Sequence, residues 1–268
     1  MEAAGVERRR NLRAPCRGSV RARMSRRRSA AVQILPCPRT VIPQLLLRTQ
    51  DAVSLLVRGH PETLLRRALG TRLHSETFAF GLRRDLDVPF EHPTAKIPLT
   101  VRPLQPGDDL SILDVDTLGG GASDVMFERL SQRRLINSKL PTCWVAIAPD
   151  GKVCYMQWLV APRDNHRIRA QWDDLFPQLA PGEALLEGAF TGDAYRGQGI
   201  MAHAMSRIAV AAREFGARWV LTYVGINNIP SLKGCKKAGF APFQRRSEAW
   251  WLLRRRVAFA PLPQGMLA

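Results

Sequence analysis

The sequence predicts a mixed α/β domain over residues 96–260, and three observations support this prediction. Apolar runs with strand-like alternation are separated by stretches with helical periodicity. Asp150-Gly151 lies between two β-prone runs, which is typical of a β-hairpin. A glycine-rich turn over 196–201 then joins a β-prone run to a helical one.

The first half of this domain is expected to begin with a strand and to end with the hairpin. Gly119 to Gly121 separate its two helices. The expected elements are a strand at 97–102, a turn at 106–109, a helix at 110–113, a second helix at 124–135 and hairpin strands at 143–147 and 152–160. A polar connection over 163–176 follows.

The second half repeats the alternation of strand and helix. Gly216 and Gly239 are placed where helices end. The expected elements are a strand at 184–191, a helix at 200–212, a strand at 219–224, a short helix at 228–238 and closing strands at 242–246 and 249–257.

Residues 1–40 are expected to form a disordered basic tail, since they hold eleven arginines and only two acids. Contact with nucleic acid or an anionic surface and an organellar transit peptide are alternative readings of this tail. Residues 41–95 are expected to form an arm outside the domain, helical as far as Leu73 and irregular over 75–98, where prolines are frequent.

The composition argues against several classes of protein. No apolar run reaches the roughly 18 residues of a membrane span. The five cysteines are odd in number and contain no C-x-x-C pair, so neither a disulfide framework nor a metal site is expected. Free thiols suit a reducing compartment, and we expect a cytoplasmic protein.

The turn Arg196-Gly197-Gln198-Gly199-Ile200-Met201 is the strongest functional signal. A glycine turn before a helix directs backbone N–H groups and the positive end of the helix dipole toward one point, which suits a phosphate or diphosphate. The turn lacks the lysine of a nucleoside triphosphate P-loop, and it is not the three-glycine dinucleotide motif.

A second segment, from Asn228 through Ser231 and Cys235 to Gly239-Phe240, follows about thirty residues later. Together the two segments resemble the signature motifs of the GNAT superfamily of acyl-CoA-dependent N-acyltransferases. The resemblance covers residues 97–258 and departs from the family at Met201 and at Cys235, where a tyrosine is usual. It implies a mostly antiparallel central sheet with splayed middle strands, flanked by helices.

The resemblance also implies where acetyl-CoA, or another acyl-CoA, would bind as co-substrate. Backbone groups of the glycine turn would hold the diphosphate, and the end of one strand and Asn228 would bind the pantetheine arm. Asn228 could equally cap a helix. The implied cofactor residues are Ala189, Phe190, Thr191, Arg196, Gly197, Gln198, Gly199, Ile200, Met201, Ala202, Asn228 and Ser231.

Three residues are candidates for catalysis. Glu187, on the strand before the turn, is the candidate base that takes a proton from an amine, although a solvent-facing charge is the alternative. Cys235 and Tyr223 are candidate acids for the departing thiolate, with core packing as the alternative for both. A strand N–H near Phe190 could stabilise an oxyanion.

The expected reaction is direct transfer of an acetyl group to a primary amine. The acceptor is open among a protein amine, an amino sugar and a small molecule, and a homodimer is also left open. Two rival functions are an inactive acyl-CoA-binding module and a nucleic-acid-binding protein that acts through the tail, although nucleic acid is not the expected partner.

Two further groups of residues, one aromatic and one basic, lie on the expected strands or close to them. The aromatic strand residues could wall an acceptor pocket or belong to the core, and they are Trp144, Tyr155, Met156, Trp158, Trp250 and Trp251. The arginines near the end of the domain are expected on a solvated face, and they are Arg245, Arg246, Arg254, Arg255 and Arg256.

Overall fold

The computed structural model describes five parts of the chain, which are residues 53, 57, 71–116, 123–138 and 140–262. The predicted basic tail and nearly all of the predicted helical part of the arm lie outside these residues. In the described part, none of the helices is long and apolar enough to cross a membrane.

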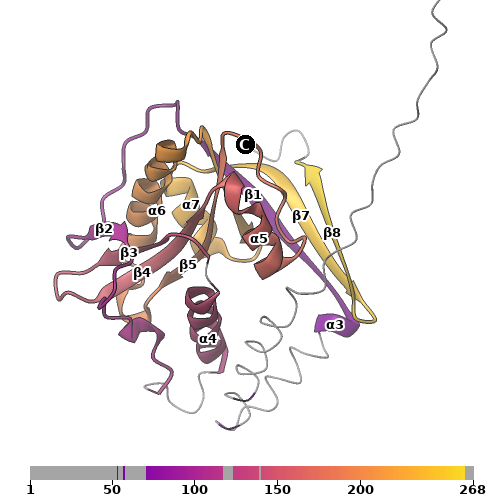
Figure 1. The fold of residues 1–268 in the computed structure, drawn as a ribbon, viewed down its shortest axis with the longest axis horizontal. Helices are drawn as coiled ribbons and strands as arrows, with labels where there is room; N and C mark the ends of the chain where they lie inside the picture. Colours follow the sequence, from indigo (N-terminus) through magenta and orange to yellow (C-terminus); the bar gives the residue numbers. More distant parts are fainter. Residues whose placement is uncertain (1–52, 54–56, 58–70, 117–122, 139, 263–268) are drawn as a thin grey trace, which may run out of the picture. The chain divides into compact units, whose positions relative to one another are not determined.

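One mixed sheet of eight strands organises the described residues (Figure 1), and its spatial order is β2-β3-β4-β5-β6-β1-β7-β8. Neighbouring strands are antiparallel except for β5 and β6, which are parallel. The strands are β1 His74–Asp85, β2 Thr100–Pro103, β3 Cys143–Ile147, β4 Val153–Val160, β5 Glu183–Thr191, β6 Trp219–Gly225, β7 Ala241–Trp251 and β8 Arg254–Pro261. The mixed, mostly antiparallel sheet that the sequence predicts is confirmed.

Helices cover both faces of this sheet (Figure 1). The covering helices are α4 Ser123–Asn137, α5 Asn165–Trp172, α6 Ile200–Ala211 and α7 Ile229–Lys237, whereas the short helix α3 Thr71–Leu73 leads directly into β1. On one face, Ile208 of α6 and Cys235 of α7 belong to a buried cluster with Leu186 of β5. On the other face, Leu135 of α4 and Ile168 of α5 pack in a second cluster. Burial of apolar surface on both faces makes the sheet the centre of the fold.

The prediction of an irregular segment over 75–98 is wrong for its first part, because His74–Asp85 forms strand β1. This strand lies between β6 and β7 and pairs with both. The sheet therefore includes residues that the sequence assigned to an arm outside the domain. Residues 86–98 have no helix or strand, as expected.

Three smaller differences concern local structure. The helix expected at 110–113 is a single 3₁₀ turn at Ser111–Leu113, and α5 lies inside the expected polar connection. The closing strands meet at Leu252 and Leu253 rather than near residue 248. Both leucines have positive φ, and this conformation is typical of Asn or Gly, so their identity gives no turn signal.

Candidate functional site

The glycine-rich turn connects β5 to α6 as predicted. Gly197 and Gly199 have φ angles of 77° and 76°, a region that side chains with a Cβ rarely adopt. Gly199 is the N-cap of α6 and gives no side-chain hydrogen bond to the helix. The first N–H groups of α6 therefore lack partners within the helix and can bind an anion.

 This turn borders a cavity of about 530 Å³, which residues of α4, β5, α6 and α7 line. We call it the turn cavity. Ten predicted cofactor residues line it, namely Ala189, Thr191, Arg196, Gly197, Gly199, Ile200, Met201, Ala202, Asn228 and Ser231.

Two predicted cofactor residues do not line the turn cavity. Phe190 is buried opposite Met156 of β4, in the core on the face of α4 and α5. Gln198 holds the turn in place instead, because its backbone oxygen accepts a hydrogen bond of 2.9 Å from the N–H of Lys96.

The start of α7 forms the opposite wall of the turn cavity. Asn228 is the N-cap of this helix, and its side chain accepts a hydrogen bond of 3.2 Å from the N–H of Ser231. A Cβ on Gly234 would lie 3.0 Å from the sulfur of Met201, so the two helices approach closely at this point. The methionine side chain is thus directed toward α7, which accommodates its departure from the family motif.

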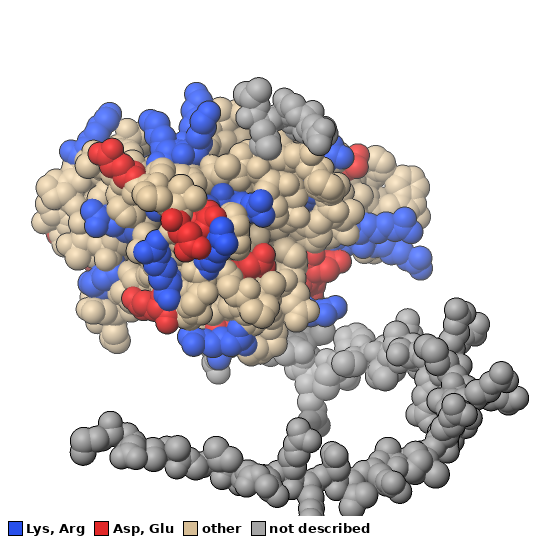
Figure 2. Space-filling model, turned by 90° about the horizontal axis from the view of Figure 1, so that it is seen from above, with Lys and Arg blue, Asp and Glu red and all other residues tan. Residues whose placement is uncertain are grey.

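Positive charge dominates the lining of the turn cavity. Lys233 and Lys237 are exposed on α7, and Arg196 projects from the turn. One acid, Glu128 of α4, also lines the cavity and lies 3.3 Å from Arg196. Lys and Arg side chains are spread over the surface in Figure 2, but these three meet at one cavity. The excess of cations favours an anionic ligand.

The parallel strands β5 and β6 separate beside this cavity. They pair only where Glu183 to Leu185 meet Trp219 to Leu221, although both strands continue beyond that point. The splayed middle strands that the resemblance implies are therefore confirmed. Their facing backbone groups are free of strand pairing and can bind an extended chain with amide groups.

A β-bulge shapes β5 at the point of separation. Glu187 pairs with Trp158 and Phe190 with Met156, so two residues of β5 stand opposite one residue of β4. Gly188 lies in the bulge with a φ of 70°, and a Cβ there would lie 2.9 Å from the ring of Trp158. The bulge leaves Ala189 exposed at the turn cavity.

Glu187 lies at the separation of the two strands. Burial raises the pKa of its carboxyl to about 7, against the smaller opposing effects of Arg246 and of hydrogen bonds from the backbone of Gly188 and Tyr223. Its buried Oε2 has no hydrogen-bond partner among the described residues. A carboxylate whose pKa is near neutrality is suited to accept a proton.

Tyr223 packs in the core and does not line the turn cavity. Its ring makes edge contacts with Phe176 at 5.4 Å and Phe259 at 6.0 Å between centroids. Its hydroxyl accepts a hydrogen bond from Gln244, and burial raises its pKa. These contacts agree with the packing role that was the alternative for this residue.

Cys235 is also buried, which does not support a role as proton donor. Its side chain has no exposed surface, and its Sγ lies 3.8 Å from the sulfur of Met205. Burial raises the pKa of its thiol to about 12. The structure thus places at this position a small helix residue that faces the core.

Replacement of Cys235 by alanine is therefore expected to leave turnover within about twofold of the unchanged protein, while it lowers the free energy of unfolding by roughly 1 kcal/mol through lost packing. Steady-state kinetics and urea unfolding measure the two effects. A loss of turnover of about 100-fold in a folded variant would return this thiol to the reaction.

The aromatic strand residues do not gather around one pocket. Tyr155, Met156 and Trp158 are buried in the sheet, whereas Trp251 is 62% exposed at the far end of β7. The expectation that the arginines are solvated is wrong for two of them. Arg246 is half-buried against the rings of Phe176 and Tyr223, and Arg255 forms ion pairs with Asp173 and Asp174.

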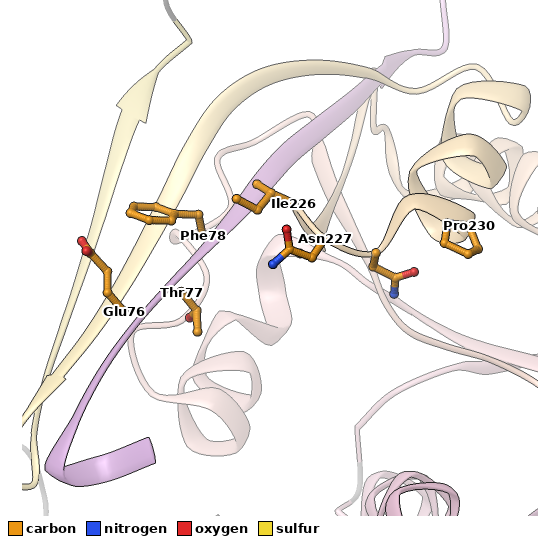
Figure 3. A pocket seen from close by; sticks show the side chains of 8 residues that line it. Glu76, Thr77, Phe78, Ile226, Asn227 and Pro230 are labelled. Atoms are coloured by element: carbon orange, nitrogen blue, oxygen red, sulfur yellow. The ribbon is translucent and has the colours of Figure 1, made fainter. Parts of the chain in front are cut away.

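A second cavity of about 560 Å³ adjoins the turn cavity, because Asn228 and Pro230 line both. Figure 3 shows Asn227 and Pro230 at the start of α7 and, from β1, the side chains of Glu76 and Phe78. A ligand in the turn cavity that reached past Asn228 would enter this second cavity.

Several lining residues of the turn cavity were missed in the sequence. They are Glu128, Tyr195, Pro230, Lys233, Gly234 and Lys237. Those on α7 lie at i, i+3, i+4 and i+7 counted from Pro230, which is one face of a helix, so helical periodicity could have found them. Glu128 comes from a distant helix, and only the tertiary fold brings it to the cavity.

Comparisons with known proteins agree with this arrangement. Residues 122–240 match the model of the acetyltransferase (GNAT) family, which spans the turn and the start of α7. No curated protein matches the chain.

Several solved structures are similar at low sequence identity. A GCN5-related N-acetyltransferase from Sphaerobacter thermophilus is 16% identical with a TM-score of 0.43, over 72% of this chain and 55% of that one. A tandem GNAT protein from the clavulanic acid biosynthesis pathway is 17% identical with a TM-score of 0.42, over 76% of this chain and 60% of that one. The present chain thus spans little more than half the length of the first of these.

The likeness to this family rests on the match to the family model, together with the two motifs that meet at the turn cavity. Residues 122–240 of this chain thus match the acetyltransferase (GNAT) family.

Proposed function

We propose that this chain is an acyl-CoA-dependent N-acyltransferase that moves an acetyl group to a primary amine. The observation that carries the proposal is that the two motif segments, far apart in the sequence, line one cavity with three cations. The diphosphate and 3′-phosphate of CoA match this charge.

The residues of the turn fit such a ligand. A Cβ at Gly197 would meet no atom within 4 Å, so there is open space at the turn, and the first N–H groups of α6 face no side-chain cap. We assign the diphosphate to the backbone of 197–202 and the adjacent positive charge to Arg196, Lys233 and Lys237. The separated edges of β5 and β6 would bind the pantetheine amides.

When bound, acetyl-CoA supplies an acyl group that is activated as a thioester. Glu187 would take the proton from the acceptor amine, since its carboxyl lies where β5 and β6 separate and its pKa is near neutrality. The burial of Cys235 supports direct transfer rather than an acyl-enzyme at that thiol. We propose a cytoplasmic location on the basis of the free thiols Cys143, Cys154 and Cys235.

The proposal is tested by calorimetric titration with acetyl-CoA and by release of free thiol across a panel of primary amines. We expect micromolar binding and amine-dependent thiol release, with the acetylated amine identified by mass spectrometry. Tight binding without thiol release for any amine would favour an inactive acyl-CoA-binding module. Absence of acetyl-CoA binding would reject the assignment of the turn cavity.

A further inference from the structure

The hairpin between β7 and β8 ends in three exposed apolar residues, next to α3 (Figure 1). Trp251, Leu252 and Leu253 are 62%, 63% and 62% exposed, and we call them the hairpin tip. None of them lines the turn cavity. Three consecutive large apolar side chains on a surface commonly mark a site of interaction.

The backbone of the hairpin tip is held in a conformation that costs free energy. Leu252 and Leu253 have φ angles of 46° and 67°, as in a two-residue type I′ turn, where Asn-Gly is preferred. Their N–H groups donate hydrogen bonds of 2.9 Å to the backbone oxygens of Leu73 and Arg72. The fold thus keeps two leucines at a turn where polar residues or glycine would be more stable, which points to a function for their side chains.

Positive charges surround the hairpin tip. Arg72, Arg254 and Arg256 are exposed, and none of them forms an ion pair within the described residues. Arg255, which lies between two of them, is instead bound to Asp173 and Asp174. The tip therefore combines an apolar end with three cations that have no acidic partner in the part of the chain that the structure describes.

The positive charge around the hairpin tip indicates which kind of surface could bind there. Contact with the tip of a second copy would bring the same arginines together and is opposed by their repulsion. Residues 41–70 of this chain are also net basic, with four arginines and two acids. An anionic lipid surface matches both features, since Trp and Leu partition into the interface of a bilayer and Arg binds acidic headgroups.

We propose that the hairpin tip docks this protein on anionic lipid bilayers, with Trp251, Leu252 and Leu253 inserted at the level of the headgroups. The inference goes beyond acyl transfer and does not depend on it. The interaction is peripheral and reversible, because a short hairpin buries only a few side chains.

The test compares the full chain with Leu252→Asn/Leu253→Gly in co-sedimentation with phosphatidylcholine vesicles, with and without phosphatidylglycerol. Asn-Gly suits the type I′ turn, so this variant is expected to keep or raise Tm. We expect its partition onto anionic vesicles to fall at least about tenfold. The basic tail is present in both proteins, so its contribution cancels in the comparison.

Two further measurements make the result decisive. Arg254→Gln/Arg256→Gln is expected to remove most of the preference for anionic over neutral vesicles. Equal partition of the unchanged chain and Leu252→Asn/Leu253→Gly would overturn the proposal. A change from dimer to monomer in that variant, measured by sedimentation without vesicles, would assign the tip to self-association and would equally reject it.

Discussion

Replacement of Glu187 by glutamine is expected to lower kcat/KM by about 10²- to 10⁴-fold, the usual contribution of a positioned base. Glutamine keeps the size and polarity of the side chain but cannot accept a proton from the amine. The KM for acetyl-CoA is expected to change little, because Glu187 does not line the turn cavity. Thiol-release kinetics with the preferred amine measure both constants.

The pH dependence gives a sharper readout for the same variant. Because the pKa of Glu187 is raised to about 7, the rate of the unchanged protein is expected to rise with pH through neutrality as this carboxyl loses its proton. The limb of the profile near pH 7 should be absent from Glu187→Gln. If the limb persists in the variant, another group is the base.

The free energy of unfolding is expected to fall as pH rises through neutrality, whereas the rate is expected to rise. The folded-state pKa of about 7 lies above the ordinary value of 4.5, so the folded chain binds this proton more tightly than the unfolded chain. The stability from this group is therefore present at low pH and is lost as pH rises from 4.5 through 7, by roughly 3 kcal/mol. Glu187→Gln should be more stable than the unchanged protein above pH 7 by up to about this amount.

Glu183→Gln is the matched control. Glu183 begins the same strand, and its carboxylate accepts a hydrogen bond of 2.8 Å from the N–H of Ala180, away from the point where β5 and β6 separate. This control is expected to keep the rate and the pH profile of the unchanged protein. Loss of activity in both variants would indicate damage to β5 rather than loss of a base.

Reversal of charge at Lys233 and Lys237 is expected to raise the Kd for acetyl-CoA at least about 100-fold. The variant Lys233→Glu/Lys237→Glu changes the local charge by four units beside the cavity, and each exposed contact with a phosphate is worth roughly 1–2 kcal/mol. Both side chains are exposed, so the helix should remain folded. Calorimetric titration at low and high salt measures the effect, which should be smaller at high salt because exposed charges are screened.

Lys236→Glu provides the control, because Lys236 is exposed on the same helix but does not line the turn cavity. Its effect on Kd is expected to stay within about threefold. Unchanged affinity in Lys233→Glu/Lys237→Glu would place the phosphates elsewhere. A substitution at Gly199 is a less clean test, since its φ of 76° and the backbone oxygen of Thr94 only 3.4 Å from a Cβ would strain the turn itself.

The sequence predicted those parts of the fold that have a local cause. The Asp150-Gly151 hairpin, the glycine turn and the start of α7 each depend on a few neighbouring residues, and the structure has each where it was expected. The separation of β5 and β6 came from the family resemblance. Most of the lining of the turn cavity followed from these same segments.

What the sequence could not give depends on tertiary contacts. The sequence pattern predicts an irregular segment at β1, because the strand depends on pairing with β6 and β7, which come much later in the chain. The burial of Cys235 and Tyr223 depends on packing across the sheet. The turn at Leu252-Leu253 breaks the usual preference of its turn type, so residue identity misled the prediction.

The position of β1 also has a consequence for how this protein folds. β1 is made before all the other described strands, yet both of its partners lie more than about 100 residues further along the chain. Such distant pairing raises the contact order and slows folding. Until β1 enters, β6 and β7 each present an unpaired edge that can recruit another chain. During synthesis, aggregation is therefore a hazard until β1, the earliest of these strands, pairs between β6 and β7.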